Sequence, residues 1–166
     1  MPSSYYSDRE RILREFSAKA HFTGAKENES ARPNSPKTRV VIADTHQPIR
    51  TAAAGILSTT CKAEVIGCAS DGARAIDDVL RLKPDILVLE VVLPVVDGIQ
   101  VTRALKNAKT QTKIVILTTI VDGSFQQAAM KAGAHAYVIK ARMLTDLPLA
   151  VRAVLEGATF HSPEKT

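Results

Sequence analysis

The sequence contains no tryptophan, and aromatic residues make up only 4% of its 166 residues. Because hydrophobic residues still reach 45%, a core must be built mainly from valine, isoleucine, leucine and alanine. Only two cysteines are present, Cys61 and Cys68, and their spacing matches no zinc motif. We therefore expect two small, partly buried thiols, rather than a disulfide framework or a structural zinc site.

Long apolar runs are also absent, since no run reaches the roughly 18–20 residues that a membrane-spanning helix needs. The first ten residues lack the apolar region of a signal peptide, so the expected location is cytoplasmic, with no membrane partner. The net charge of +5 is not concentrated in a basic arm. Seven basic and five acidic residues precede residue 38, and 15 basic and 12 acidic residues follow it. Charge alone therefore gives little reason to expect direct nucleic-acid binding.

Residues 1–38 differ in composition from the rest and are predicted to be an N-terminal extension. Ser7 and Glu10 match a capping box, and apolar residues then recur at helical spacing, which predicts a short helix over residues 8–20. Residues 24–38 are rich in Gly, Asn, Ser, Pro and charge, which is typical of a disordered linker. Whether this helix docks on the following domain or acts on another molecule is left open.

Residues 39–160 are predicted to form one α/β domain, followed by a tail over residues 161–166. Short apolar runs alternate with segments long enough for a helix, which specifies a parallel sheet covered on both faces. Strands are expected at 40–43, 64–69, 86–90, 113–118 and 136–139. Helices are expected at 48–58, from a Ser70 cap to Leu82, at 98–106, at 123–132 and from a Thr145 cap to Gly157.

Polar side chains lie at the end of four of these five strands or directly after it. Asp44 and Thr45 follow the first strand, Glu90 ends the third, Thr118 ends the fourth and Lys140 follows the fifth. Ligands and chemistry of open α/β sheets are found at the carboxyl edge of the strands, where these side chains would converge. No Gly-x-Ser-x-Gly motif or glycine-rich phosphate loop is present and the four histidines do not cluster, so the chain is not expected to be an enzyme.

Five motifs resemble the receiver domain of two-component response regulators, and most closely the receivers of nitrate-regulator type. They cover residues 39 to about 160 and are Val41–His46, Pro84–Glu90, Leu93–Gly98, Ile116–Thr119 and Ala132–Lys140. The resemblance implies a flavodoxin-like (βα)5 three-layer sandwich with strand order 2-1-3-4-5. It also implies a place in phosphorelay signal transduction, with a histidine kinase-related signalling protein, another protein or a second copy of the chain as partner.

The resemblance assigns a role to each of the polar strand-end residues. An aspartate at the position of Glu90 normally accepts a phosphoryl group. Two acids at Asp44 and Thr45 normally hold Mg²⁺ together with that acceptor. Thr118 and Lys140 occupy the positions that bind the phosphoryl oxygens, and Tyr137 that of the aromatic switch, which turns inward when the hydroxyl moves.

Two residues depart from this pattern, because Thr45 replaces a metal-binding acid and Glu90 replaces the acceptor aspartate. Mg²⁺ requires near-octahedral oxygen ligation, so a site built from Asp44 and Glu90 would be weak or absent, and no cofactor is expected. Phosphoryl transfer depends on in-line positioning and on metal charge, so the longer Glu90 should be a poor acceptor. The expected function is a pseudo-receiver, a protein-interaction and signalling module that is independent of aspartate phosphorylation.

Several alternatives remain open on the sequence. Glu90 could imitate the phosphorylated state by reaching Lys140 and Thr118, or it could form an ion pair with Lys140 that only holds the fold. The chain could still accept phosphate, on Thr45 or Glu90. Residues 157–163 resemble the start of a linker to a helix-turn-helix domain, so the chain could also be the receiver part of a transcription regulator. Arg142, Asp146, Arg152 and Glu156 would offer charges for contacts on the last helix, or form a solvated face.

Overall fold

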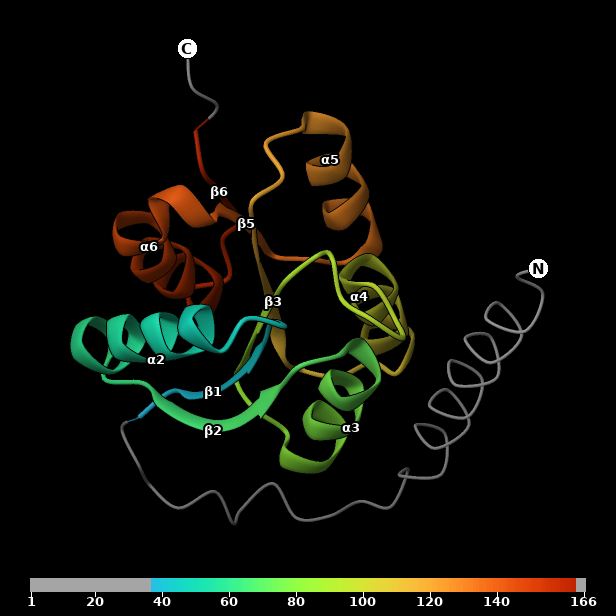
Figure 1. Cartoon of the computed structure of the whole chain (residues 1–166), viewed down its shortest axis with the longest axis horizontal. Coiled ribbons are helices and arrows are strands. Elements are labelled where there is room, and N and C mark those ends of the chain that lie inside the picture. The colour runs from blue at the N-terminus through green and yellow to red at the C-terminus, as the bar shows by residue number, and fades with distance from the viewer. Residues whose placement is uncertain (1–36, 164–166) are drawn as a thin grey trace, which may run out of the picture.

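The computed structural model describes residues 37–163, in which strands and helices alternate along the chain (Figure 1). The helix expected over residues 8–20 and residues 24–36 of the expected linker lie outside the described residues. In chain order the elements are β1 (Arg39–Ala43), α2 (Gln47–Cys61), β2 (Glu64–Ala69), α3 (Gly72–Leu82), β3 (Ile86–Leu89), α4 (Gly98–Asn107), β4 (Lys113–Thr118), α5 (Gly123–Ala132), β5 (Ala136–Ile139), a 3₁₀ turn η1 (Lys140–Arg142), α6 (Met143–Leu155) and β6 (Phe160–His161).

The sheet is parallel throughout, with the strand order β2-β1-β3-β4-β5-β6. The expected flavodoxin-like order of the first five strands is therefore confirmed. The sixth strand was not predicted, because two residues are too few to show the apolar pattern of a strand. Phe160 and His161 pair with Ala136 and Tyr137 of β5, so ordered structure continues beyond the expected domain boundary at residue 160.

Helices cover both faces of the sheet. Figure 1 shows α2 and α6 on one face and α3, α4 and α5 on the other. Each face has its own apolar cluster, because successive side chains of a strand point to opposite sides. The four residues of β3 are all fully buried, as expected for a central strand of a doubly covered sheet. Among the described residues, no helix is both long enough and apolar enough to cross a membrane.

The start of α3 differs from the prediction, since Asp71 rather than Ser70 is the N-cap. The Asp71 carboxylate accepts a hydrogen bond from the Arg74 amide at 2.8 Å. Gly72 is the first helical residue and packs directly against the β3–α4 loop, where an added Cβ would lie 1.8 Å from the Val96 carbonyl oxygen. The Gly72 amide also donates to the Pro94 carbonyl at 3.2 Å, so this contact joins α3 to the loop that follows Glu90.

The last helix also begins earlier than predicted. Thr145 is not its N-cap, because η1 leads directly into α6 at Met143, with Arg142 in the cap position. The Thr145 hydroxyl lies within the first turn and donates to the Arg142 carbonyl at 3.1 Å. Asp146, one of the charges expected to be available for contacts, is buried instead, with 2% of its surface exposed.

Candidate functional site

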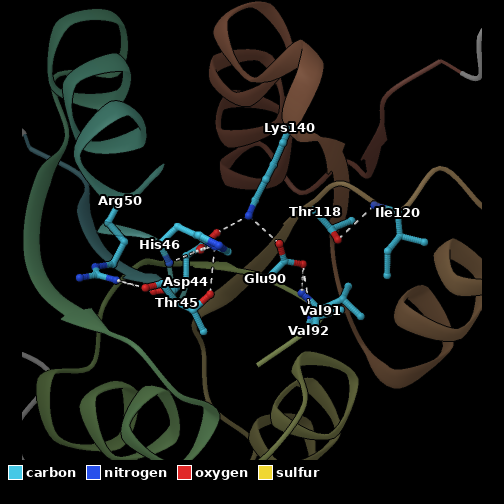
Figure 2. Close-up of polar contacts among 10 residues, drawn as sticks. All are labelled: Asp44, Thr45, His46, Arg50, Glu90, Val91, Val92, Thr118, Ile120 and Lys140. Atoms are coloured by element: carbon cyan, nitrogen blue, oxygen red, sulfur yellow. Dashed lines mark hydrogen bonds and ion pairs between the residues drawn. The ribbon is translucent and has the colours of Figure 1, made fainter. Parts of the chain in front are cut away.

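Three of the residues singled out in the sequence meet at the carboxyl edge of the sheet. Asp44 and Glu90 follow β1 and β3, which are neighbouring strands, and the Glu90 amide donates to the Ala43 carbonyl at 2.9 Å. Lys140 follows β5, and its side chain reaches back across the edge to both carboxylates (Figure 2). The Lys140 ammonium lies 2.5 Å from Asp44 Oδ2 and 2.6 Å from Glu90 Oε2. We call Asp44, Glu90 and Lys140 the ion-pair cluster.

The cluster is shielded from water, since the Lys140 side chain is only 9% exposed and both acids are buried. Burial lowers the pKa of Lys140, but hydrogen bonds and charge interactions with Asp44 and Glu90 outweigh it, so the net pKa lies above the ordinary lysine value. Lys140 therefore stays charged at neutral pH. Two carboxylates share one ammonium, so the formal charge of the cluster is negative.

The second oxygen of Glu90 is held by the backbone that follows it. Oε1 accepts hydrogen bonds from the Val91 amide at 2.6 Å and from the Val92 amide at 3.2 Å. The loop is itself fixed, because the Gly98 amide donates to the Val91 carbonyl at 2.8 Å. An added Cβ at Gly98 would lie 2.3 Å from the Glu90 carbonyl oxygen, which explains why glycine follows Asp97 here. Both carboxylate oxygens of Glu90 are thus engaged within the protein.

The second carboxylate oxygen of Asp44, which does not face Lys140, is also held by neighbouring groups. Its Oδ1 accepts from the His46 amide at 2.8 Å and lies 3.2 Å from the exposed His46 ring. The Arg50 guanidinium, one helical turn into α2, donates to the Asp44 carbonyl at 2.6 Å and to the Thr45 carbonyl at 3.2 Å (Figure 2). His46 ends the first receiver motif but was given no role in the sequence analysis, and Arg50 was not singled out. For Arg50 the only signal was proximity in the chain to Asp44.

Thr45 does not join the ion-pair cluster. Its side chain is exposed, and its hydroxyl lies 3.0 Å from His46 Nδ1. Thr118 is buried at the end of β4, where its hydroxyl oxygen accepts from the Ile120 amide at 3.3 Å. Within residues 37–163, no hydrogen bond or ion pair links Thr118 to Glu90 or Lys140.

Tyr137 lies inside the molecule, with 1% of its surface exposed. Its hydroxyl donates to the Ile120 carbonyl at 3.0 Å, so Tyr137 and Thr118 bind the same residue of the β4–α5 loop. Burial, followed by the negative charges of Glu90 and Asp122, raises the pKa of Tyr137 to about 12. The side chain therefore stays neutral and keeps its donor at physiological pH.

The donor set at this edge fits Mg²⁺ poorly. Mg²⁺ requires several oxygen ligands, whereas the two carboxylates that converge here already bind an ammonium. In the described part of the chain, no three His, Cys, Asp or Glu side chains form a group that could hold a metal ion. Lys140 supplies the positive charge that the two acids need.

The family model of the response regulator receiver domain matches residues 40–152. The chain belongs to this family. Receiver domains and the regulators that carry them are signalling and transcription proteins rather than enzymes, in agreement with the expectation from sequence.

Curated relatives of this receiver include two transcription or response regulators. The chain is 33% identical over 128 residues to the uncharacterized transcriptional regulatory protein YvfU of Bacillus subtilis strain 168, covering 77% of the chain and 64% of the relative. It is 30% identical over 126 residues to the response regulator protein VraR of Staphylococcus epidermidis, covering 76% of the chain and 60% of the relative. The chain thus spans less than two thirds of the length of these relatives.

Solved receiver structures match the same region. A two-component response regulator of the LuxR family from Aurantimonas sp. SI85-9A1 superposes with a TM-score of 0.73 at 28% identity, covering 76% of this chain and 91% of the other. The signal receiver domain of the response regulator NarL from Mycobacterium tuberculosis superposes with a TM-score of 0.70 at 28% identity. The match covers 73% of this chain and 98% of the other. The nitrate-regulator resemblance seen in the motifs is therefore matched in three dimensions.

The receiver also contains a second polar cluster that was missed in the sequence. Arg142, Thr145 and Ser162 all bind the buried Asp146 carboxylate. The spacing of Arg142 and Asp146 is that of a helical i,i+4 pair, which was visible in the sequence but gives no information about burial. Ser162 carried no signal, because it lies 16 residues from Asp146 and beyond the last predicted helix.

Proposed function

We propose that this receiver is a protein-interaction and signalling module that acts independently of aspartate phosphorylation. Ion pairs within the chain stabilise its site. The observation that carries the proposal is the Lys140 ammonium lying between Asp44 and Glu90. Thr45 and Glu90 take the positions of a metal-binding acid and of the phosphoacceptor, by resemblance to the family.

Chemistry at Glu90 argues against its use as a phosphoacceptor. Phosphoryl transfer requires a carboxylate oxygen free to attack in line, with a metal ion to neutralise the phosphate. In this receiver Oε1 accepts from two amides and Oε2 binds Lys140, so either oxygen would have to lose its partners before attack. At position 45, a metal-binding carboxylate is replaced by the Thr45 hydroxyl, which is exposed to solvent and lies outside the ion-pair cluster.

Phosphorylation can be tested directly with a matched gain-of-function control. The wild-type chain is incubated with Mg²⁺ and acetyl phosphate, and its mass is measured by intact-mass spectrometry. In a second sample, amide NMR shifts of the chain are measured with Mg²⁺ and beryllofluoride. The wild type should gain no phosphoryl group and show no Mg²⁺-dependent shifts at the sheet edge. The double variant Thr45→Asp/Glu90→Asp, which restores both aspartates, should respond to both reagents. A Mg²⁺-dependent phosphoryl adduct on the wild type would overturn the proposal.

Glu90 has two candidate roles within this function, and the geometry favours the structural one. A mimic of the phosphorylated state would engage both Lys140 and Thr118, but the Thr118 hydroxyl binds the Ile120 amide instead. One carboxylate also carries less charge and fewer acceptor oxygens than a phosphoryl group. We therefore propose that Glu90 stabilises the fold. Glu90→Gln should lower the melting temperature without changing self-association in sedimentation velocity, and a changed association constant would favour the mimic.

The surface of α6 supports a protein partner, which we propose is a second copy of the chain. Leu144 and Leu155 lie on one side of the helix at i and i+11, and they are 74% and 47% exposed. The adjacent helix α2 contains a single charged residue, Arg50, and exposes small polar or apolar residues. The double variant Leu144→Asp/Leu155→Asp should reduce dimer in sedimentation velocity, whereas Phe125→Asp, at an exposed apolar residue of α5 on the other face of the sheet, should not.

A second candidate function is the receiver part of a transcription regulator. It is favoured by the relatives, one of which is described as a transcriptional regulatory protein and extends well beyond the matched region. The reading frame that follows the coding region of this chain would decide between the two. A helix-turn-helix domain in frame would support the regulator, and a stop codon would support an isolated receiver.

A further inference from the structure

The C-terminal segment Gly157–Pro163 is bound to β5, the strand that directly precedes Lys140. After Gly157, whose φ of +84° favours glycine, β6 pairs with the start of β5. Ser162 then makes three hydrogen bonds. Its amide donates to the Tyr137 carbonyl at 2.9 Å, its hydroxyl donates to Asp146 Oδ2 at 2.6 Å, and its hydroxyl oxygen accepts from the Ile139 amide at 3.1 Å.

Asp146, which follows Lys140 in the chain, completes a hydrogen-bond network with Ser162, Arg142 and Thr145. Arg142 Nε donates to Oδ2 at 2.7 Å and Nη2 donates to Oδ1 at 3.3 Å, while the Thr145 hydroxyl lies 2.9 Å from Oδ1. The network thus holds Ile139, the residue before Lys140, through Ser162. It also holds Arg142, two residues after Lys140, through Asp146.

We propose that Asp146 and Ser162 are positioning residues for Lys140, and that they couple the ion-pair cluster to the docking of the C-terminal segment. Lys140 begins the 3₁₀ turn η1, so the direction of its side chain depends on where Ile139 and Arg142 are held. The ammonium meets two oxygens at 2.5 and 2.6 Å, a geometry that a small displacement of the turn would disturb.

Coupling of this kind acts in both directions. If the network positions Lys140, then loss of a Lys140 partner must weaken the network and with it the docking of Ser162. β6 is the element best suited to respond, because a two-residue edge strand has few contacts and opens at low free energy. A network that only fastens the C-terminal segment would not transmit a change made at Glu90.

The inference goes beyond the proposed function. It requires that Lys140 bind Asp44 and Glu90, and it does not depend on whether Glu90 accepts phosphate. Its test uses no phosphodonor and no Mg²⁺, so the two proposals can fail separately.

The first arm measures amide hydrogen exchange by NMR in the wild-type chain and in Glu90→Gln. The amides of Ile139 and Ser162 report the network, and the Val41 amide in β1, which is paired on both sides, reports global opening. Glu90→Gln should speed exchange at Ile139 and Ser162 by at least about fivefold more than at Val41, the lower end of common coupling strengths. An equal increase at all three amides would overturn the inference.

The second arm reads the reverse direction at the Lys140 ammonium, through its side-chain NMR resonance. Asp146→Asn and Ser162→Ala should each shift this resonance. Asp78→Asn is the matched control, because Asp78 is 1% exposed and is held by Arg74 and Arg81 of its own helix, α3, on the opposite face of the sheet. A Lys140 resonance that stays unchanged in Asp146→Asn would overturn the inference, even if this variant is less stable than the wild type.

Discussion

Lys140 is the residue on which the carboxyl edge of the sheet depends. It is the sole cation within ion-pair distance of Asp44 or Glu90 among the described residues other than the exposed His46 ring. Two buried carboxylates without a counter-charge are strongly unfavourable, because desolvation is no longer offset by Coulomb attraction. The stability of this receiver should therefore be sensitive to any change that removes the ammonium.

Removing the Lys140 ammonium alone should lower the unfolding free energy more than removing it together with the Glu90 charge. Lys140→Met should lower the unfolding free energy by about 3–5 kcal/mol, the usual cost of leaving a buried charge unpaired. Lys140→Met/Glu90→Gln should be less destabilised than Lys140→Met alone, since only one buried acid then remains unpaired. Urea unfolding of the four proteins of this cycle measures the difference, and strictly additive effects would contradict the ion pair.

Tyr137 should titrate unusually late. Its pKa of about 12 exceeds the ordinary value of 10.0, so the fold favours the protonated hydroxyl. The associated stability is fully present below pH 10 and is lost as the pH rises from about 10 to about 12. The tyrosinate absorbance of the wild type minus that of Tyr137→Phe should therefore rise near pH 12. A midpoint near 10 would show that Tyr137 is not buried as described.

The start of α3 is in close contact with the backbone of the β3–α4 loop. Gly72 at the start of α3 meets the backbone of the β3–α4 loop, the same loop whose amides hold Glu90. Val95 in that loop has a positive φ of 69°, a strained conformation for a β-branched residue. This loop is fixed by its neighbours, and the position of Glu90 depends on that fixation.

A methyl group at Gly72 should therefore be poorly tolerated. Gly72→Ala should lower the unfolding free energy by roughly 3 kcal/mol, because Cβ would overlap the Val96 carbonyl and the loop must move. Gly55→Ala in α2 is the control, since nothing lies within 4 Å of a Cβ there and the helix should gain about 0.5–1 kcal/mol. Thermal unfolding compares the two, and similar effects would refute the close contact.

For the molecule as a whole, acid should weaken the domain through the buried carboxylate of Asp146. Burial raises the pKa of Asp146, but hydrogen bonds from Arg142, Ser162 and Thr145 outweigh it and hold the pKa below the ordinary 3.8. A lowered pKa means that this stability is present above about pH 3.8 and is lost as the pH falls further, toward the folded-state pKa. The stability difference between wild type and Asp146→Asn should be constant from pH 7 to 5 and should shrink below pH 4. A difference that stays constant to pH 3 would contradict the role of the charge.

Much of the fold was predictable from local pattern. The bounds of β2, β4, β5 and α5 were predicted to the residue, because apolar runs bounded by Gly, Pro and charged residues carry that information locally. The caps at Ser70 and Thr145 were wrong. The next residue, Asp71, caps α3 through the Arg74 amide, and the preceding turn η1 leads directly into α6. β6 was missed because its two residues are held by pairing with β5 and by Ser162, neither of which has a local signature.

The sequence by itself determined which residues stand at the carboxyl edge, because strand direction and alternation place Asp44, Glu90 and Lys140 there whatever the loops do. By resemblance to the receiver family, it also indicated that Thr45 and Glu90 take the positions of a metal-binding acid and of the phosphoacceptor. Folding decided that Lys140 binds both acids, that Thr45 faces solvent and that Asp146 is buried. The physical reason is that side-chain direction at a strand end is set by loops and helices from elsewhere in the chain, whose packing no local pattern encodes.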